Sequence, residues 1–131
     1  MRKAYLAIKY YPDHSNRPDI ERISRTLEQN GFEPVCVTRD LEKWGAVQFS
    51  PAELMARSFV EIDSSEVVVI ELSAKGVGLG IEAGYAYARR IPIVTIARTG
   101  SDISTTLQGI SQHLFWYDEI EDLLEFFARL G

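Results

Sequence analysis

The sequence predicts one three-layer α/β domain over residues 1–131, with a five-stranded, mainly parallel sheet and helices on both faces. Strand-like apolar runs alternate with helix-like stretches along all 131 residues, without a repeat, a low-complexity segment or a linker. The run Val67-Val68-Val69-Ile70 is unbroken and β-branched, which is typical of a parallel strand buried on both faces. Right-handed crossovers limit the strand order to a flavodoxin-like or Rossmann-like one.

The first half of the chain carries clear helix-start signals. Pro18 suits the first turn of one helix, and Ser50 with Pro51 forms an N-cap and N1 pair for another, with Glu53 as the capping-box partner. We expect a strand at 4–10, a helix at 18–30, a strand at 33–38, an irregular connection at 39–50 and a helix from residue 50 onward.

The second half alternates in the same way and places two loops at one edge of the sheet. We expect a strand at 66–72, a helix from about Gly80 to Arg90, a strand at 92–97, a short helix at 104–109, a strand at 114–117 and a helix at 118–130. Ligands of such sheets bind at the carboxyl ends of the strands, near the point where the strand order reverses. The loops at 9–17 and 73–80 should therefore meet and form the functional site.

Composition limits the kinds of site and partner. With one cysteine and two histidines, no disulfide framework or metal cluster is expected, and Cys36 should be a buried thiol. The net charge of −5 disfavours nucleic acid as a partner, although a small anionic ligand remains compatible with it. No apolar stretch of membrane-spanning length and no signal sequence is present, so we expect a cytoplasmic protein that does not bind membranes.

The segment 73–85 carries the densest functional signal. Its alternating glycines, Gly76, Gly78 and Gly80, allow a ligand to approach main-chain N–H groups closely. Glu82 is expected in the first turn of the following helix, where free N–H groups favour the ionised form that a nucleophile needs. On spacing alone, the alternative that Glu82 only complements the helix dipole is favoured. The glycines also approximate a dinucleotide-binding fingerprint, but they follow the third strand and not the first.

Two segments resemble a known family. Glu66-Val67-Val68-Val69-Ile70-Glu71-Leu72 and Gly80-Ile81-Glu82-Ala83-Gly84-Tyr85-Ala86 resemble the nucleoside 2-deoxyribosyltransferase superfamily, most closely its nucleoside 5′-monophosphate N-hydrolase branch. The resemblance implies that Glu82 is the catalytic glutamate that attacks the anomeric carbon. It also implies that Ser104 contacts the 5′-phosphate in a neighbouring subunit, within a homodimer or a higher symmetric oligomer. Ser58 stands where the family has an aspartate that assists the leaving base, which is a departure from the pattern.

Further candidate ligands of the substrate lie in the two loops. Tyr10 or Tyr11 can stack on a base and Arg17 can pair with a phosphate, although a solvated loop is the alternative for this segment. The hydrolases often place a phosphate-contacting serine at the position of Gly76. Backbone N–H groups from Gly76 to Gly78, with Lys75 or Lys9, can replace that serine.

Together these residues predict an enzyme that needs no cofactor. We expect an N-glycosidase that cleaves the base–sugar bond of a (deoxy)nucleoside 5′-monophosphate through a covalent glycosyl-Glu82 intermediate, with Ser58 as the second candidate catalytic position. The alternatives are a nucleoside deoxyribosyltransferase and a nucleotide-binding or sensing module that Ser58 has weakened as a catalyst.

Overall fold

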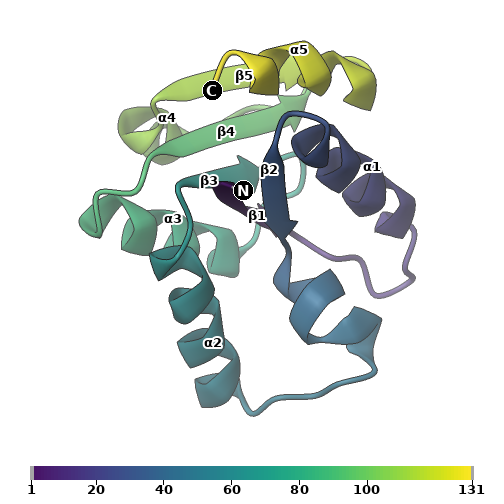
Figure 1. The fold of residues 1–131 in the computed structure, drawn as a ribbon, viewed down its shortest axis with the longest axis vertical. Coiled ribbons are helices and arrows are strands. Elements are labelled where there is room, and N and C mark those ends of the chain that lie inside the picture. Colours follow the sequence, from purple (N-terminus) through teal and green to yellow (C-terminus); the bar gives the residue numbers. More distant parts are fainter. Residues whose placement is uncertain (1, 131) are drawn as a thin grey trace.

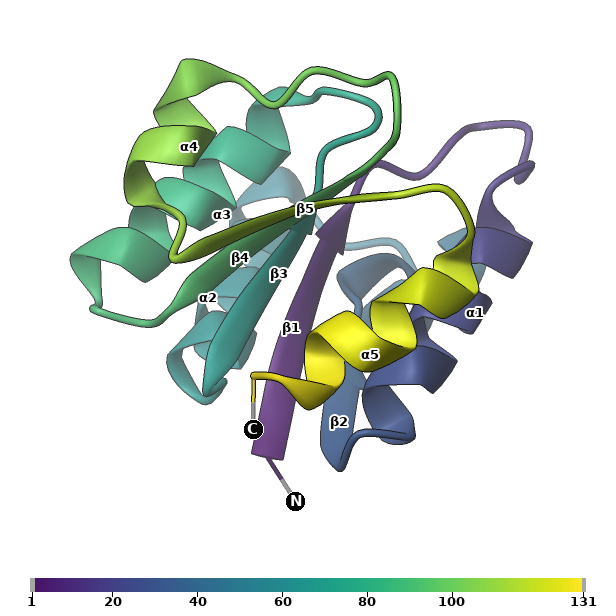
Figure 2. The ribbon, with the colours of Figure 1, turned by 90° about the horizontal axis from the view of Figure 1, so that it is seen from above.

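The computed structural model describes residues 2–130 and contains a five-stranded parallel sheet between two layers of helices (Figures 1 and 2). The strand order is β2-β1-β3-β4-β5, and all neighbouring strands are parallel. The strands are β1 (Arg2–Ile8), β2 (Phe32–Val35), β3 (Val67–Glu71), β4 (Ile93–Arg98) and β5 (His113–Tyr117). This is the flavodoxin-like order, so the predicted fold class is confirmed.

Helices cover both faces of the sheet, as Figure 2 shows: α1 and α5 lie on one face, and α2, α3 and α4 lie on the other. Their bounds are α1 (Arg17–Glu28), α2 (Pro51–Asp63), α3 (Val77–Ala88), α4 (Thr105–Ile110) and α5 (Leu123–Ala128). All five residues of β3 are buried. Val67 and Val69 belong to the α1/α5 side of the core, and Val68 and Ile70 belong to the other side, as the unbroken β-branched run predicts.

The register places the functional loops at one edge. Strand β1 pairs with β3 from Ala4 opposite Val67 to Ile8 opposite Glu71, so both strands end at the same level. The chain reverses direction across the sheet at this pair, because β1 connects to β2 and β3 connects to β4. The predicted meeting of the two loops is confirmed, since the Lys9 side chain lies 3.8 Å from the place where a Cβ on Gly76 would be.

Helix α3 begins at Val77, three residues before the predicted start at Gly80. Gly76 is its N-cap, with extended backbone angles, and Gly78 and Gly80 lie inside the helix. The glycine alternation predicts a loop because glycines allow tight backbone turns. The expectation that Glu82 lies in the first turn is therefore wrong, and Glu82 lies in the second turn instead.

The connection after β2 is more ordered than expected. A π-helical turn, η1 (Val37–Leu41), is followed by a 3₁₀ turn, η2 (Lys43–Gly45). Ser50 caps α2 as predicted, because its hydroxyl accepts a hydrogen bond from the Glu53 N–H at 3.2 Å. At the C-terminal end, the predicted helix divides into a 3₁₀ turn, η3 (Ile120–Asp122), and α5. No helix among residues 2–130 has the length and apolar character needed to cross a membrane.

Candidate active site

A cleft of about 190 Å³ lies at the carboxyl end of β1, on the face covered by α2 and α3. Its walls come from β1, the end of β2, the η1–η2 connection, α2 and α3. The lining residues are Tyr5, Leu6, Ala7, Ile8, Cys36, Val37, Thr38, Glu42, Leu54, Met55, Ser58, Gly78 and Glu82. The fold thus brings both predicted catalytic positions, Glu82 and Ser58, into one cavity.

Glu82 is a partly buried carboxyl group whose ionisation is controlled by Tyr5 and by desolvation. Burial raises the pKa of Glu82 to about 7, and a hydrogen bond from the Tyr5 side chain acts in the opposite direction. Tyr5 is 1% exposed, and burial together with the negative charge of Glu82 raises its own pKa, so it stays a hydrogen-bond donor. The prediction that the helix terminus keeps Glu82 ionised needs correction. In the second turn, desolvation is the largest influence on the pKa of Glu82, and it acts against the ionised form.

The glycine face of α3 leaves room beside Glu82. Gly78 precedes Glu82 by four residues, so both lie on one helix face, and both line the cleft. A Cβ added at Gly78 or at Gly80 would meet no heavy atom within 4 Å. Each glycine destabilises a helix by about 0.5–1 kcal/mol relative to alanine. Packing within the chain does not require these glycines, whereas a ligand in the cleft would use the space at Gly78.

The N-terminus of α3 offers donors for an anion. Gly76 supplies no side-chain cap, so the N–H groups of the first turn have no intrahelical partner. The stem of Lys9 passes beside Gly76, whereas the Lys75 ammonium is bound to the Asp102 carbonyl at 2.8 Å. Of the two lysines in these loops, Lys9 is therefore the one placed to reach an anion at this helix end.

One curated protein matches nearly the whole chain. It comes from Thermofilum pendens, is provisionally named 2′-deoxynucleoside 5′-phosphate N-hydrolase 1, and is 25% identical over 135 residues, which cover 94% of this chain and 90% of that protein. No family model matches the chain.

Solved structures share the fold over similar lengths. The CMP N-glycosidase BcmB from Clostridium botulinum is 18% identical with a TM-score of 0.71, and the match covers 99% of this chain and all of that one. A 2-deoxyribosyltransferase from Bacillus psychrosaccharolyticus is 14% identical with a TM-score of 0.75, covering 98% of this chain and 96% of that one. The predicted resemblance to the nucleoside 2-deoxyribosyltransferase superfamily is confirmed.

Ser58, which the resemblance places where the family has an aspartate, lines the cleft that contains Glu82. Its side chain is 2% exposed, and its hydroxyl donates a 2.8 Å hydrogen bond to the Leu54 carbonyl one turn earlier in α2. The Tyr5 side chain also interacts with this hydroxyl. Ser58 is thus held in a structural arrangement, and its hydroxyl is not a general acid comparable to a carboxyl group.

Among the predicted substrate ligands, Gly78 lines the cleft, whereas Lys9, Gly76 and the remaining ones do not. Tyr10 bonds to His14 and packs against Trp44 with ring centroids 5.5 Å apart, and the Arg17 guanidinium lies 4.4 Å above the same indole ring. Ser104 is the N-cap residue of α4, and its hydroxyl is 3.2 Å from that of Thr106. All the predicted substrate contacts stay predictions: those by Lys9, Tyr10, Arg17, Gly76, Gly78 and, from a neighbouring subunit, Ser104.

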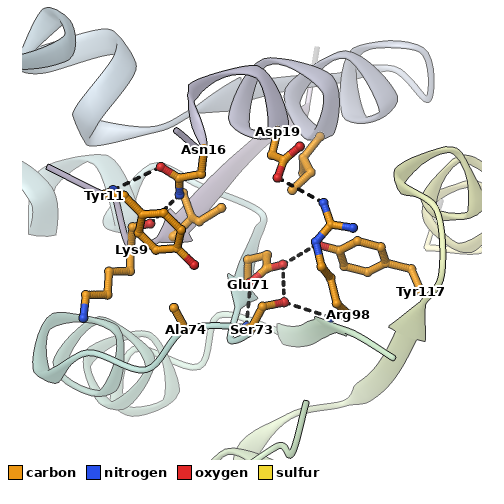
Figure 3. Close-up of a pocket in the computed structure, with 11 residues that line it drawn as sticks. Lys9, Tyr11, Asn16, Asp19, Glu71, Ser73, Ala74, Arg98 and Tyr117 are labelled. Atoms are coloured by element: carbon orange, nitrogen blue, oxygen red, sulfur yellow. Dashed lines mark hydrogen bonds and ion pairs between the residues drawn. The ribbon is translucent and has the colours of Figure 1, made fainter. Parts of the chain in front are cut away.

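A second cavity of about 170 Å³ lies near the same sheet edge, on the α1/α5 side (Figure 3). Glu71 is 4% exposed and accepts hydrogen bonds from the Tyr117 hydroxyl and, at 2.7 Å each, from the Ser73 N–H and hydroxyl. The Ser73 hydroxyl accepts from the Arg98 N–H at 2.8 Å, and the Arg98 side chain pairs with Asp19 at 3.0 Å. These polar groups satisfy one another, so the network joins α1, β3, β4 and β5 without needing a ligand.

Sequence reasoning missed two polar residues of the cleft, Tyr5 and Glu42. Tyr5 carries the only hydroxyl group in the apolar run from Ala4 to Ile8. A single polar group in an otherwise apolar strand is the sequence signal that could have marked Tyr5 as a site residue. Glu42 lies in the connection that has no hydrophobic periodicity, so no sequence pattern marked it. Only the folded chain brings both residues to Glu82.

Proposed function

We propose that this protein is an N-glycosidase that cleaves the base–sugar bond of a (deoxy)nucleoside 5′-monophosphate, with Glu82 as its nucleophile. The observation that carries the proposal is the shared cleft in which Glu82, Tyr5 and the glycine face of α3 meet. The names of the N-hydrolase from Thermofilum pendens and of the CMP N-glycosidase support this chemistry.

The geometry of α3 supports a phosphorylated substrate. A helix N-terminus with free N–H groups binds phosphate, and Lys9 adds a positive charge beside it. From Gly78 to Glu82 the helix rises about 6 Å, at 1.5 Å per residue. A 5′-phosphate held near Gly76 and Gly78 would therefore place the pentose along the helix, with its anomeric carbon toward Glu82.

The reaction proceeds in two steps. The ionised Glu82 carboxylate attacks the anomeric carbon, the C–N bond breaks, and its electron pair leaves with the base, which takes up a proton. Water then attacks the same carbon, releases the sugar 5-phosphate and regenerates the carboxylate. Tyr5 donates a hydrogen bond that stabilises the ionised form and orients the attacking group. Attack by a second base in place of water would make the enzyme a transferase.

Ser58 favours a second candidate function, a nucleotide-binding or sensing module without turnover. A module of this kind would keep the cleft and the phosphate-binding helix end but would lack proton assistance to the base. In this case nucleotides would bind, and no base would be released.

The test is incubation with a panel of ribo- and deoxynucleoside monophosphates, followed by chromatographic detection of free base. Glu82→Ala should lower the rate by several orders of magnitude while the fold is retained, and Glu28→Gln, an exposed carboxylate of α1, is the matched control. Turnover of Glu82→Ala within tenfold of wild type would show that the nucleophile assignment is wrong. Binding without any base release would favour the sensing module. If a different free base is added to the mixture, a transferase would form a new nucleotide that contains this base.

A further inference from the structure

The cleft needs a proton donor that Ser58 does not provide. A base that leaves a sugar carries the bonding electron pair, and general acids that protonate such leaving groups typically accelerate the reaction by about 10²–10⁴. The titratable residues that line the cleft are Glu82, Tyr5, Cys36 and Glu42. Glu82 is the proposed nucleophile and Tyr5 is bound to it. Burial raises the pKa of the Cys36 thiol to about 11, so it is a weak acid at neutral pH.

Glu42 is the remaining group, and its backbone is held firmly. It follows η1 and precedes η2, and its N–H donates to the Val37 carbonyl at 2.9 Å. Its own carbonyl accepts hydrogen bonds from the N–H groups of Gly45 at 3.0 Å and Val47 at 2.9 Å. Within residues 2–130, the Glu42 carboxyl has neither an ion pair nor a hydrogen bond from another side chain, and it lines the cleft.

The backbone after Glu42 is strained, which indicates that its position is imposed by the fold. Lys43 and Trp44 have φ angles of 49° and 59°, in the left-handed region that non-glycine residues rarely adopt. The Trp44 ring is held by contacts with Tyr10 and Arg17. These two residues, which the sequence marks as substrate ligands, therefore anchor the segment that presents Glu42 to the cleft.

We propose that Glu42 is the general acid that protonates the departing base, in the role that the superfamily assigns to an aspartate at the position of Ser58. This inference rests on the proposed N-glycosidase function. In the first step the Glu42 carboxyl proton passes to a base nitrogen as the C–N bond breaks and the Glu82 ester forms. In the second step the Glu42 carboxylate accepts a proton from the attacking water, and Glu82 leaves as a carboxylate. Both residues return to their starting states.

The ionisable groups around Glu42 are compatible with this role. Glu42 shares the lining of the cleft with Glu82 of α3, Tyr5 of β1 and Cys36, the N-cap residue of η1. Within η1, Arg39 is already paired with Asp40 at 3.0 Å and with Glu21 at 3.3 Å. Burial raises the pKa of Glu42 above the ordinary glutamate value, which favours the protonated form that an acid needs.

The first test is Glu42→Gln, with Glu28→Gln as the control for the loss of one carboxylate. We expect kcat on the best nucleoside monophosphate to fall about 10²- to 10³-fold, with KM changed less than about threefold. With p-nitrophenyl ribose 5-phosphate, whose leaving group departs without a proton, the loss should stay below about tenfold. The alkaline fall of the wild-type pH–rate profile should also disappear in Glu42→Gln, leaving a rise through about pH 7 that reports Glu82.

The second test restores an acid at the other position. The kcat of the double variant Glu42→Gln with Ser58→Asp should be at least tenfold higher than that of Glu42→Gln, because both positions line one cleft. Glu42→Asp keeps a carboxyl group and should retain more activity than Glu42→Gln. A Glu42→Gln enzyme with kcat within threefold of wild type, or with a loss confined to KM, would overturn the role of Glu42 alone. A wild-type protein that releases no base would overturn the proposed function itself.

Discussion

The Glu82 carboxyl should reduce the stability of the folded protein at neutral and alkaline pH. Burial raises its pKa from 4.5 to about 7, so the folded protein holds this proton more tightly than the unfolded chain does. The favourable contribution is complete below about pH 4.5 and is lost as the pH rises through 7. At about 1.36 kcal/mol per unit, the shift corresponds to an upper limit of about 3 kcal/mol. Because Glu82 is partly exposed, we expect about 1–2 kcal/mol.

Glu82→Gln isolates this effect. The amide keeps the size of the side chain and an acceptor for the Tyr5 hydroxyl, but it carries no charge at any pH. Urea unfolding of both proteins from pH 4.5 to 8.5 gives the difference in free energy of unfolding, and the other titrating groups cancel because both proteins contain them. The variant should equal wild type near pH 4.5 and exceed it by about 1–2 kcal/mol at pH 8.5.

Two results for Glu82→Gln would contradict a destabilising effect of the ionised Glu82. A variant that is less stable than wild type at pH 8.5, or a difference that does not change with pH, would refute the argument from desolvation. Glu28→Gln, which removes an exposed carboxylate from α1, should show no comparable gain at pH 8.5.

Three other predictions concern α3, Tyr5 and Ser104. Gly78→Ala and Gly80→Ala should each stabilise α3 by about 0.5–1 kcal/mol, as measured by thermal unfolding. Of the two, Gly78→Ala alone should raise KM, because Gly78 lines the cleft and Gly80 does not, and equal effects on KM would contradict this assignment. Tyr5→Phe removes the hydrogen bond that lowers the pKa of Glu82, so the acidic limb of kcat/KM should move to higher pH, and an unmoved limb would argue against the contact. If Ser104 completes a neighbour's site, light scattering at micromolar concentration should give more than the 14.8 kDa of one chain, and an active monomer would contradict a shared site.

Much of the fold was predictable because its signals are local. The apolar run of β3, the Ser50 cap of α2 and the alternation of strands and helices each lie within a few residues. The start of α3 was not predictable in this way. Glycines at 78 and 80 indicate a loop, but Leu79 and Ala83 pack into the core and stabilise a helix there. Tertiary burial outweighs the low helix propensity of glycine at these positions.

The sequence by itself determined the candidate nucleophile and the departure at Ser58, since both depend on residue identity within a recognisable pattern. Only the tertiary structure decided that Tyr5 and Glu42 share a cleft with Glu82, and that desolvation rather than the helix terminus governs the Glu82 pKa. The physical reason is that parallel strands carry distant segments to one edge of the sheet. The burial of a carboxyl group depends on all the segments packed around it, and no local stretch of sequence contains them together.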